Sequence, residues 1–255
     1  MAKELYSLKM KNILAVLVNY GEDQLQYLQQ VVTELKSFKN YKVSIIVNSN
    51  IPLDIEGIDQ VNIIELDDYQ LLPLTCRQVI WDHREDFDVF LFGENDHLFK
   101  EYHVDRHLEY TNILPSDKIS GLLQYEQIDE KLYFPAWHAS YDWDYSNIEE
   151  YGGKKFAHFS NLHQATFILT REQLNKIGGI YDFTKYFKGP NHPQYSKKCL
   201  VNTEIYEYCN MKKLICISDL KENFIHHLPN KYIKKHPQEN HNNKIEFLTE
   251  TSLKV

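Results

Sequence analysis

The first hundred residues alternate between short apolar runs and segments whose apolar residues recur at helical spacing. A continuous apolar run occupies 13–18, and mostly apolar runs occupy 43–47, 61–66 and 87–92. Each is short enough to be a single buried strand, because strands covered on both faces are apolar throughout. Residues 25–35 and 74–86 instead place their apolar side chains on one helical face. The order strand, helix, strand, strand, helix, strand predicts an α/β fold with a mostly parallel sheet flanked by helices.

The second half of the chain has shorter and less regular patterns. They predict helices at 103–112, at 171–177 between a Thr170 cap and the pair Gly178 and Gly179, and from Asn202 or Thr203 to Asn210. Strands are expected at 119–125, 164–169 and 214–217. Residues 133–151 are rich in aromatic side chains and show no period, which indicates a long functional loop. The polar segment 231–255 is expected to be a mobile or peripheral tail.

Composition and charge narrow the class of protein. The chain has 255 residues, 43% of them hydrophobic and 25% charged, and we expect one domain over 1–230. A net charge of −8 disfavours direct nucleic-acid binding. Four scattered cysteines without a CxxC pair indicate reduced thiols. No apolar signal segment and no bilayer-spanning apolar run is found, so we expect a cytoplasmic protein.

The fourth apolar run ends in two acids that flank an amide, in the order Glu94, Asn95, Asp96. A buried strand does not need acids at its end, whereas a divalent cation that holds a diphosphate takes carboxylate ligands. If the chain stays extended here, Glu94 and Asp96 point to the same side. They would then lie together at the carboxyl ends of the strands, where open α/β sheets bind ligands. The other interpretation is a solvated acidic turn.

The order of these segments resembles that of the GT-A fold glycosyltransferases, which use nucleotide-sugar donors, and most of all their inverting family 2 group. The resemblance covers 13–228. The matching segments are 13–20 (first strand and nucleotide loop), 43–50 (second strand), 94–96 (metal-binding acids), 164–182 (strand and helix of the acceptor half), 202–204 (catalytic acid) and 215–227 (last strand and following histidine). The sequence departs from the family in three places: amides replace the acid near Asn48, Asn95 replaces the central acid, and Glu204 stands alone.

The resemblance implies a GT-A domain with a nucleotide-sugar-binding half at 12–99 and an acceptor-binding half at 100–230. It implies transfer of a sugar, with inversion, from a nucleoside-diphosphate sugar of the UDP type to the hydroxyl of a glycan, glycolipid or other acceptor. A cation, Mn²⁺ or Mg²⁺, would neutralise the leaving diphosphate. A base would take the proton of the acceptor hydroxyl. Asp96 and His226 are the implied metal ligands, and Glu204 is the implied base, with Glu207 as the fallback.

The remaining candidate residues fall into two groups. Nucleotide binding is expected at Asn19, Tyr20, Glu22, Asn48, Arg77 and Glu94. A wall for the acceptor or the donor sugar is expected at Trp137, His138, Tyr141, Asp142 and Trp143. Each residue also has a plain structural interpretation, such as an ion pair within the fold for Arg77, a helix-start acid for Glu204 and a surface histidine for His226. We interpret His103 and His107 as surface histidines, because no HExxH pattern is present.

Other classes of protein remain open or are disfavoured by specific features. A non-catalytic nucleotide-sugar or carbohydrate-binding protein on the same fold is the main alternative. A nucleotidyltransferase needs a basic, glycine-rich loop after the first strand, and residues 19–23 are acidic with one glycine. No GxxxxGK[ST] motif is present, which excludes a P-loop NTPase. Basic residues at 231–236 are either solvated or a peripheral contact with anionic lipid.

Overall fold

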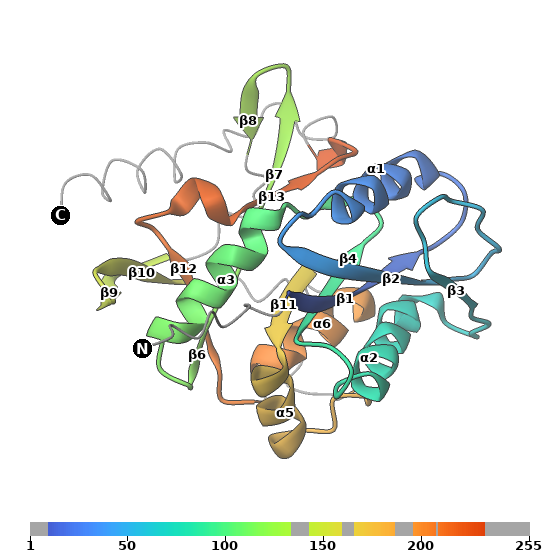
Figure 1. Ribbon diagram of the computed structural model, residues 1–255. Helices are drawn as coiled ribbons and strands as arrows, with labels where there is room; N and C mark the ends of the chain where they lie inside the picture. Colours follow the sequence, from blue (N-terminus) through green and yellow to red (C-terminus); the bar gives the residue numbers. More distant parts are fainter. Residues whose placement is uncertain (1–9, 134–142, 160–165, 187–195, 208, 233–255) are drawn as a thin grey trace, which may run out of the picture.

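A computed structural model of the protein describes residues 10–133, 143–159, 166–186, 196–207 and 209–232. Its central sheet has five strands in the order β11-β4-β1-β2-β3 (Figure 1). The strands are β1 (Lys11–Asn19), β2 (Tyr41–Ser49), β3 (Gln60–Ile63), β4 (Val89–Glu94) and β11 (Thr166–Thr170). The first four run parallel, and β11 pairs antiparallel with β4. The predicted α/β class with a mostly parallel, GT-A-like sheet is confirmed.

Helices cover both faces of this sheet, and successive side chains of β1 point into two different cores. Ile13, Ala15 and Leu17 face a core shared with α1 and α3, while Leu14, Val16 and Val18 face a core shared with α2, α5 and α6. In Figure 1, α1 lies on one side of the sheet and α2, α5 and α6 on the other. The helices are α1 (Leu25–Lys36), α2 (Leu72–Asp82), α3 (Glu101–Ile113), α5 (Arg171–Ile180) and α6 (Lys197–Glu207).

Two smaller sheets of four strands each make up much of the second half. Their strand orders are β6-β12-β10-β9 and β5-β13-β7-β8. The strands are β5 (His97–Leu98), β6 (Lys118–Ser120), β7 (Leu123–Ile128), β8 (Lys131–Tyr133), β9 (Trp143–Tyr151), β10 (Lys154–Phe159), β12 (Lys212–Cys216) and β13 (Phe224–His227). Two 3₁₀ helices, η1 (Tyr69–Leu71) and η2 (Leu220–Asn223), complete the described elements.

Besides α6, which begins at Lys197 and not at Asn202 or Thr203, three elements differ from their predictions. The single strand expected at 119–125 is two strands, β6 and β7, which belong to different sheets and are separated at Gly121. Part of the loop expected at 133–151 is β9, which pairs antiparallel with β10, while 134–142 lies outside the described residues. Helix α5 continues through Gly178, where a Cβ atom would lie 2.1 Å from Cη2 of Trp81. This glycine therefore permits close packing instead of ending the helix.

His103 and His107 are buried, which corrects their interpretation as surface residues. They are 1% and 4% exposed and lie on the inner face of α3. Nε2 of His103 lies 2.9 Å from the Phe224 carbonyl oxygen, and Nε2 of His107 lies 2.8 Å from Oε1 of Gln173. Burial lowers the pKa of each histidine to about 4. The two neutral rings therefore join α3 to segments of the second half.

These two histidines predict a loss of stability in mild acid. Their pKa values in the folded protein lie below the ordinary value near 6.5, so their stabilising effect is complete above pH 6.5 and disappears as the pH falls through 4. The free energy of unfolding should fall by on the order of 3 kcal/mol per histidine over this range. Urea unfolding of the wild-type protein and His107→Gln at pH 7 and pH 4 measures the difference. An exposed-site variant, His83→Gln, should keep the wild-type pH slope, and the same slope in His107→Gln would contradict the prediction.

Candidate functional site

A cavity of about 200 Å³ opens at the carboxyl ends of β1 and β4. The chain leaves β1 toward β2 on one side and returns to β4 on the other, so this is the point where the strand order reverses. Open α/β sheets bind their ligands at such a point. Val18 and Glu94 are register partners on the two strands and both line the cavity. The other lining residues are Tyr20, Gln24, Tyr69, Leu72, Pro73, Asn95 and Lys198.

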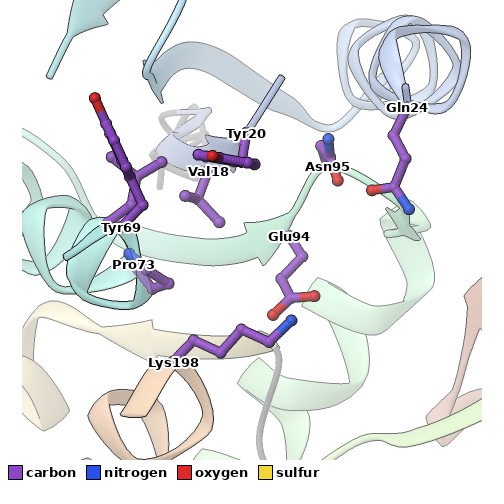
Figure 2. Close-up of a pocket in the computed structure, with 9 residues that line it drawn as sticks. Val18, Tyr20, Gln24, Tyr69, Pro73, Glu94, Asn95 and Lys198 are labelled. Carbon is purple, nitrogen blue, oxygen red and sulfur yellow. The ribbon is translucent and has the colours of Figure 1, made fainter. Parts of the chain in front are cut away.

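One wall of the cavity is aromatic and the opposite side is charged. The Tyr20 ring is 61% exposed and its centroid lies 5.2 Å from that of Tyr69. An exposed ring of this kind offers a face on which a base can stack. Figure 2 shows Lys198 extending its amino group toward the Glu94 carboxylate. The structure thus brings together two predicted nucleotide-binding residues, Tyr20 and Glu94, whereas Glu22 is exposed and does not line the cavity.

A chain of buried amide hydrogen bonds ties together the loops that follow β1, β2 and β4. Nδ2 of Asn95 donates to Oδ1 of Asn19 over 2.7 Å, and Nδ2 of Asn19 donates to the Gly21 carbonyl and to Oγ of Ser49. The Gly21 N–H donates to Oδ1 of Asn50 over 2.8 Å. Asn19, predicted to contact the nucleotide, is 1% exposed. Its side chain is therefore buried and supports the loops around the cavity through hydrogen bonds.

Asn48 and Arg77 also support the fold and do not face the cavity. Asn48 is 1% exposed, and its Nδ2 donates to Oγ1 of Thr75 over 2.8 Å. Arg77 is fully buried, and its guanidinium donates to the carbonyl oxygens of Phe183 over 2.5 Å and Val201 over 2.6 Å. This corrects the predicted contact of Arg77 with a diphosphate. The side chain instead joins α2 to α6 and to the segment after α5.

Asp96 lies in a separate buried cluster with His97 and His227. The three side chains are 3%, 2% and 5% exposed, and potential ligand atoms of all three lie within 4.8 Å of one another. The chain turns at Asn95 and Asp96 instead of staying extended. Glu94 therefore faces the cavity while Asp96, which does not line it, belongs to the cluster. The expectation that Glu94 and Asp96 share one face is wrong for this reason.

Two polar atoms of the cluster face each other as an ion pair without a well-formed hydrogen bond. Oδ1 of Asp96 and Nδ1 of His97 lie 2.9 Å apart but are not aligned for a hydrogen bond. Among the residues that the structure describes, neither atom has a hydrogen-bond partner. Buried polar atoms are seldom left in this state. A bound cation would satisfy both, so the residues fit a metal site.

The cluster also shifts the pKa values of its members. Burial alone would raise the pKa of Asp96, but the charge of His97 and the hydrogen bond from His227 hold it well below its usual range. For His227, burial acts to lower the pKa, but its contacts with Asp96 and Glu126 raise it to about 9. Nε2 of His227 lies 3.4 Å from Oδ2 of Asp96, and Nδ1 lies 2.7 Å from Oε1 of Glu126.

Strand β13 places His227, and not His226, beside Asp96. It pairs antiparallel with β5, so that His227 is the register partner of His97, and the Leu228 N–H donates to the Asp96 carbonyl over 2.9 Å. Successive residues of a strand point to opposite faces. His226 accordingly stacks on Tyr125, with ring centroids 4.8 Å apart. His227, and not the predicted His226, therefore belongs to the cluster with Asp96.

Sequence reasoning missed His97, Gln124 and Glu126. Gln124 and Glu126 are buried polar residues on β7, and each contacts one histidine of the cluster. Their only sequence signal is the alternation of apolar and polar residues over 123–126. Tyr232, at the start of the predicted tail, also returns to the cluster, because its N–H donates to both Glu126 carboxylate oxygens over 3.0 and 3.1 Å.

The predicted base and acceptor residues are not tested by the described part of the chain. Glu204 lies on α6, which begins at Lys197 and not at Asn202 or Thr203, so Glu204 is not in the first helical turn. Its side chain is outside the described residues. Trp143 begins β9, but its side chain is also outside them, as are Trp137, His138, Tyr141 and Asp142.

Comparison with known proteins gives structural matches only. No protein-family model matches the chain, and no curated protein matches it. The structure of residues 1–349 of TarS from S. aureus is similar, with a TM-score of 0.49 and 9% identity over 88% of this chain and 62% of that chain. A structure of S. aureus TarS has a TM-score of 0.45 and 10% identity over 80% of this chain and 35% of that chain. The chain spans less than two thirds of the length of either match.

The described helices were also compared with the requirements of a membrane span. Within the described ranges, every helix is too short or too polar to cross a bilayer.

Replacement of Arg77 should destabilise the protein strongly. Arg77→Met leaves the buried carbonyl groups of Phe183 and Val201 without their donor, and we expect the free energy of unfolding to fall by about 3 kcal/mol. Arg84→Met is the matched control, because Arg84 is a half-buried residue stacked on Trp81, and it should cost less than about 1 kcal/mol. Chemical denaturation of the three proteins measures both changes. Equal stability of the two variants would contradict the structural role of Arg77.

Proposed function

We propose that this protein is a metal-dependent glycosyltransferase that moves a sugar from a nucleoside-diphosphate sugar to an acceptor hydroxyl, with inversion. The observation that carries the proposal is the placement of two sites on one turn. Glu94 and Asn95 line the cavity at the reversal of strand order, and the next residue, Asp96, belongs to a buried cluster that fits a cation. The resemblance of the segment order to GT-A glycosyltransferases supports the same function.

In this proposal, residues 12–99 bind the donor. The base stacks on Tyr20 beside Tyr69, and Glu94 accepts hydrogen bonds from the ribose. Lys198 supplies a positive charge at the cavity, which favours a diphosphate in a protein whose net charge is −8. A UDP-type donor is proposed from the resemblance to GT-A glycosyltransferases, because every base can stack on a tyrosine face.

Asp96 and His227 would hold the cation, Mn²⁺ or Mg²⁺. When bound, such an ion neutralises charge on the leaving diphosphate. His227 is held by the pairing of β13 with β5, and the Asp96 carbonyl accepts from the Leu228 N–H, so the fold positions both residues before any ligand arrives. Fixed charges of this kind stabilise a transition state without reorganisation during the reaction.

Residues 100–230 would bind the acceptor, a glycan, glycolipid or other hydroxyl compound. Glu204 would take the proton of the attacking hydroxyl, and residues 137–143 would form the sugar wall. We further propose that the protein acts in the cytoplasm, with at most peripheral contact with a membrane through the basic residues at 231–236. Direct binding of nucleic acid is not part of the proposal, because the protein is acidic.

The burial of Asp96 favours a second candidate function. Because Asp96 is 3% exposed and does not line the cavity, the cluster could serve the fold alone. The protein would then be a non-catalytic nucleotide-sugar or carbohydrate-binding protein. Donor turnover distinguishes the two functions, since a binding protein would take up the nucleotide and release no sugar.

Nucleotide binding should depend on the Tyr20 ring. A screen of UDP and other nucleoside diphosphates with Mn²⁺ should raise the melting temperature by several degrees for one base. Tyr20→Ala should then weaken binding of that nucleotide by about tenfold or more, because base–aromatic stacking contributes about 1–3 kcal/mol. Tyr102, another exposed tyrosine, lies on α3, and Tyr102→Ala should bind like the wild-type protein. Unchanged affinity in Tyr20→Ala would place the base elsewhere.

Transfer should depend on Glu204. Glu204→Gln keeps the size of the side chain and removes the base, so nucleotide affinity should stay nearly constant while the rate of transfer falls by about 10²–10⁴. Glu207→Gln, on the same helix, is the matched comparison. Product formation from UDP-sugars is measured by release of UDP. Full activity in Glu204→Gln with loss of activity in Glu207→Gln would assign the base to Glu207. A wild-type protein that binds donors without turnover would support the binding-protein alternative.

A further inference from the structure

We propose that an ion pair between Asp68 and Lys197, here called the latch, holds two walls of the cavity together, and that both residues are positioning residues for donor binding. Each precedes a residue that lines the cavity, since Tyr69 follows Asp68 and Lys198 follows Lys197. The proposal deepens the proposed function and rests on it only for the identity of the ligand. The latch itself is measured without any ligand, so a protein that transfers no sugar could still show it.

The two walls come from distant parts of the chain. Tyr69 begins η1, which continues directly into α2, and Lys198 lies in the first turn of α6. Figure 2 shows both side chains at the border of the same cavity. The latch residues are 129 positions apart in the sequence. The distance between these walls therefore depends on contacts between elements and not on chain connectivity.

One carboxylate joins the two elements because its oxygens have different partners. Oδ1 of Asp68 accepts a hydrogen bond from the Gln70 N–H over 3.1 Å, which caps η1, and Oδ2 accepts one from Nζ of Lys197. Lys197 is the first residue of α6. The hydrogen bond from Lys197 also lowers the pKa of Asp68, so the carboxylate is charged at neutral pH. A displacement of the start of α6 is therefore transmitted to η1.

A second contact fixes α6 farther along the helix. The Arg77 guanidinium, on α2, donates to the Val201 carbonyl over 2.6 Å, and Arg77 is fully buried. The latch side chains are 34% and 48% exposed, so water and salt weaken their attraction. The strong inner contact and the weak outer contact lie on either side of Lys198 in the sequence. The first turn of α6 is thus the part of this wall that can move away while the rest of the helix stays in place.

The latched form brings the charged side of the cavity close to its aromatic wall. Tyr69 packs beside Tyr20, with ring centroids 5.2 Å apart, while Lys198 supplies a positive charge. A ligand that needs both walls binds the latched form, and its apparent affinity falls with the population of that form. Exposed ion pairs shift such equilibria only slightly. Loss of the latch should therefore weaken binding by about two- to fivefold.

A general charge effect gives a different pattern from the latch. An anionic ligand is attracted by positive charge. Charge alone therefore predicts tighter binding by Asp68→Asn, weaker binding by Lys197→Gln and wild-type affinity in the double variant, whose net charge is unchanged. The latch predicts weaker binding in all three proteins, because each substitution breaks the same pair. The two explanations differ in sign for Asp68→Asn, which keeps the capping oxygen of η1 and removes only the charge.

The first experiment uses no ligand. Hydrogen–deuterium exchange of the full-length protein, followed by mass spectrometry, reports the opening of η1 and of the first turn of α6. Lys197→Gln, a substitution on α6, should speed exchange in residues 69–71 by about two- to fivefold, and about 0.5 M salt should reduce the difference. Lys197→Arg keeps the charge and should exchange like the wild-type protein. Unchanged exchange at 69–71 in Lys197→Gln would overturn the proposal, even in a protein that transfers sugar.

The second experiment measures the affinity for UDP with Mn²⁺ by calorimetry. Asp67→Asn is the matched control, because Asp67 is an exposed neighbour that forms no ion pair within the described part of the chain. Asp68→Asn should bind UDP about two- to fivefold more weakly than Asp67→Asn, and the double variant should bind it more weakly than the wild-type protein by a similar factor. Tighter binding by Asp68→Asn with wild-type affinity in the double variant would overturn the proposal. A wild-type protein that binds no UDP, while the exchange result holds, would count against the proposed donor alone.

Discussion

The buried hydrogen bond between Asn95 and Asn19, 2.7 Å from Nδ2 to Oδ1, fixes the turn on which both candidate sites depend. It ties the end of β4 to the end of β1 and holds the backbone where Glu94 faces the cavity and Asp96 faces the cluster. A carboxylate at position 95 would add a third negative charge within three residues, and a buried uncompensated charge is costly. The amide gives the same hydrogen bond without that charge. The departure of Asn95 from the acidic pattern of the GT-A family has a physical reason in this contact.

The pairing of β13 between β5 and β7 has a comparable role for the second half. It brings His227, from near the end of the described chain, against Asp96 from the end of the central sheet. It also sets which of two consecutive histidines faces inward. Glu126 on the far side of His227 gives this ring a carboxylate at each nitrogen, which explains why its pKa is raised despite burial. The cluster is thus held together by charge as well as by strand pairing.

The sequence predicts the central sheet well because each of its parallel strands is a local apolar run. The elements that it misplaces depend on contacts between distant residues. β6 and β7 lie in one stretch whose pattern predicts a single strand, and only their different partners, β12 and β13, show that they are two strands. Arg77 gives no local sign that it is buried, since its acceptors lie more than a hundred positions later. Asp96 could be identified from its place after a strand. Glu126 could not be identified in this way, because its contact with His227 forms only when β13 pairs with β7.

The cavity and the buried cluster of Asp96, His97 and His227 share an electrostatic environment although no lining residue belongs to both. Tyr232 shows this most directly. Burial raises the pKa of its hydroxyl to about 12, and the carboxylates of Glu94, on the cavity side, and Asp96 and Glu126, on the cluster side, add to the rise. Its ring lies 5.4 Å from that of His227. A neutral phenol therefore lies beside the cluster within reach of both sets of charges, and a cation bound at Asp96 would reduce the negative potential that a diphosphate meets on the cavity side. A cation at the buried cluster and a diphosphate at the open cavity would for this reason be coupled through charge, even without a shared ligand atom.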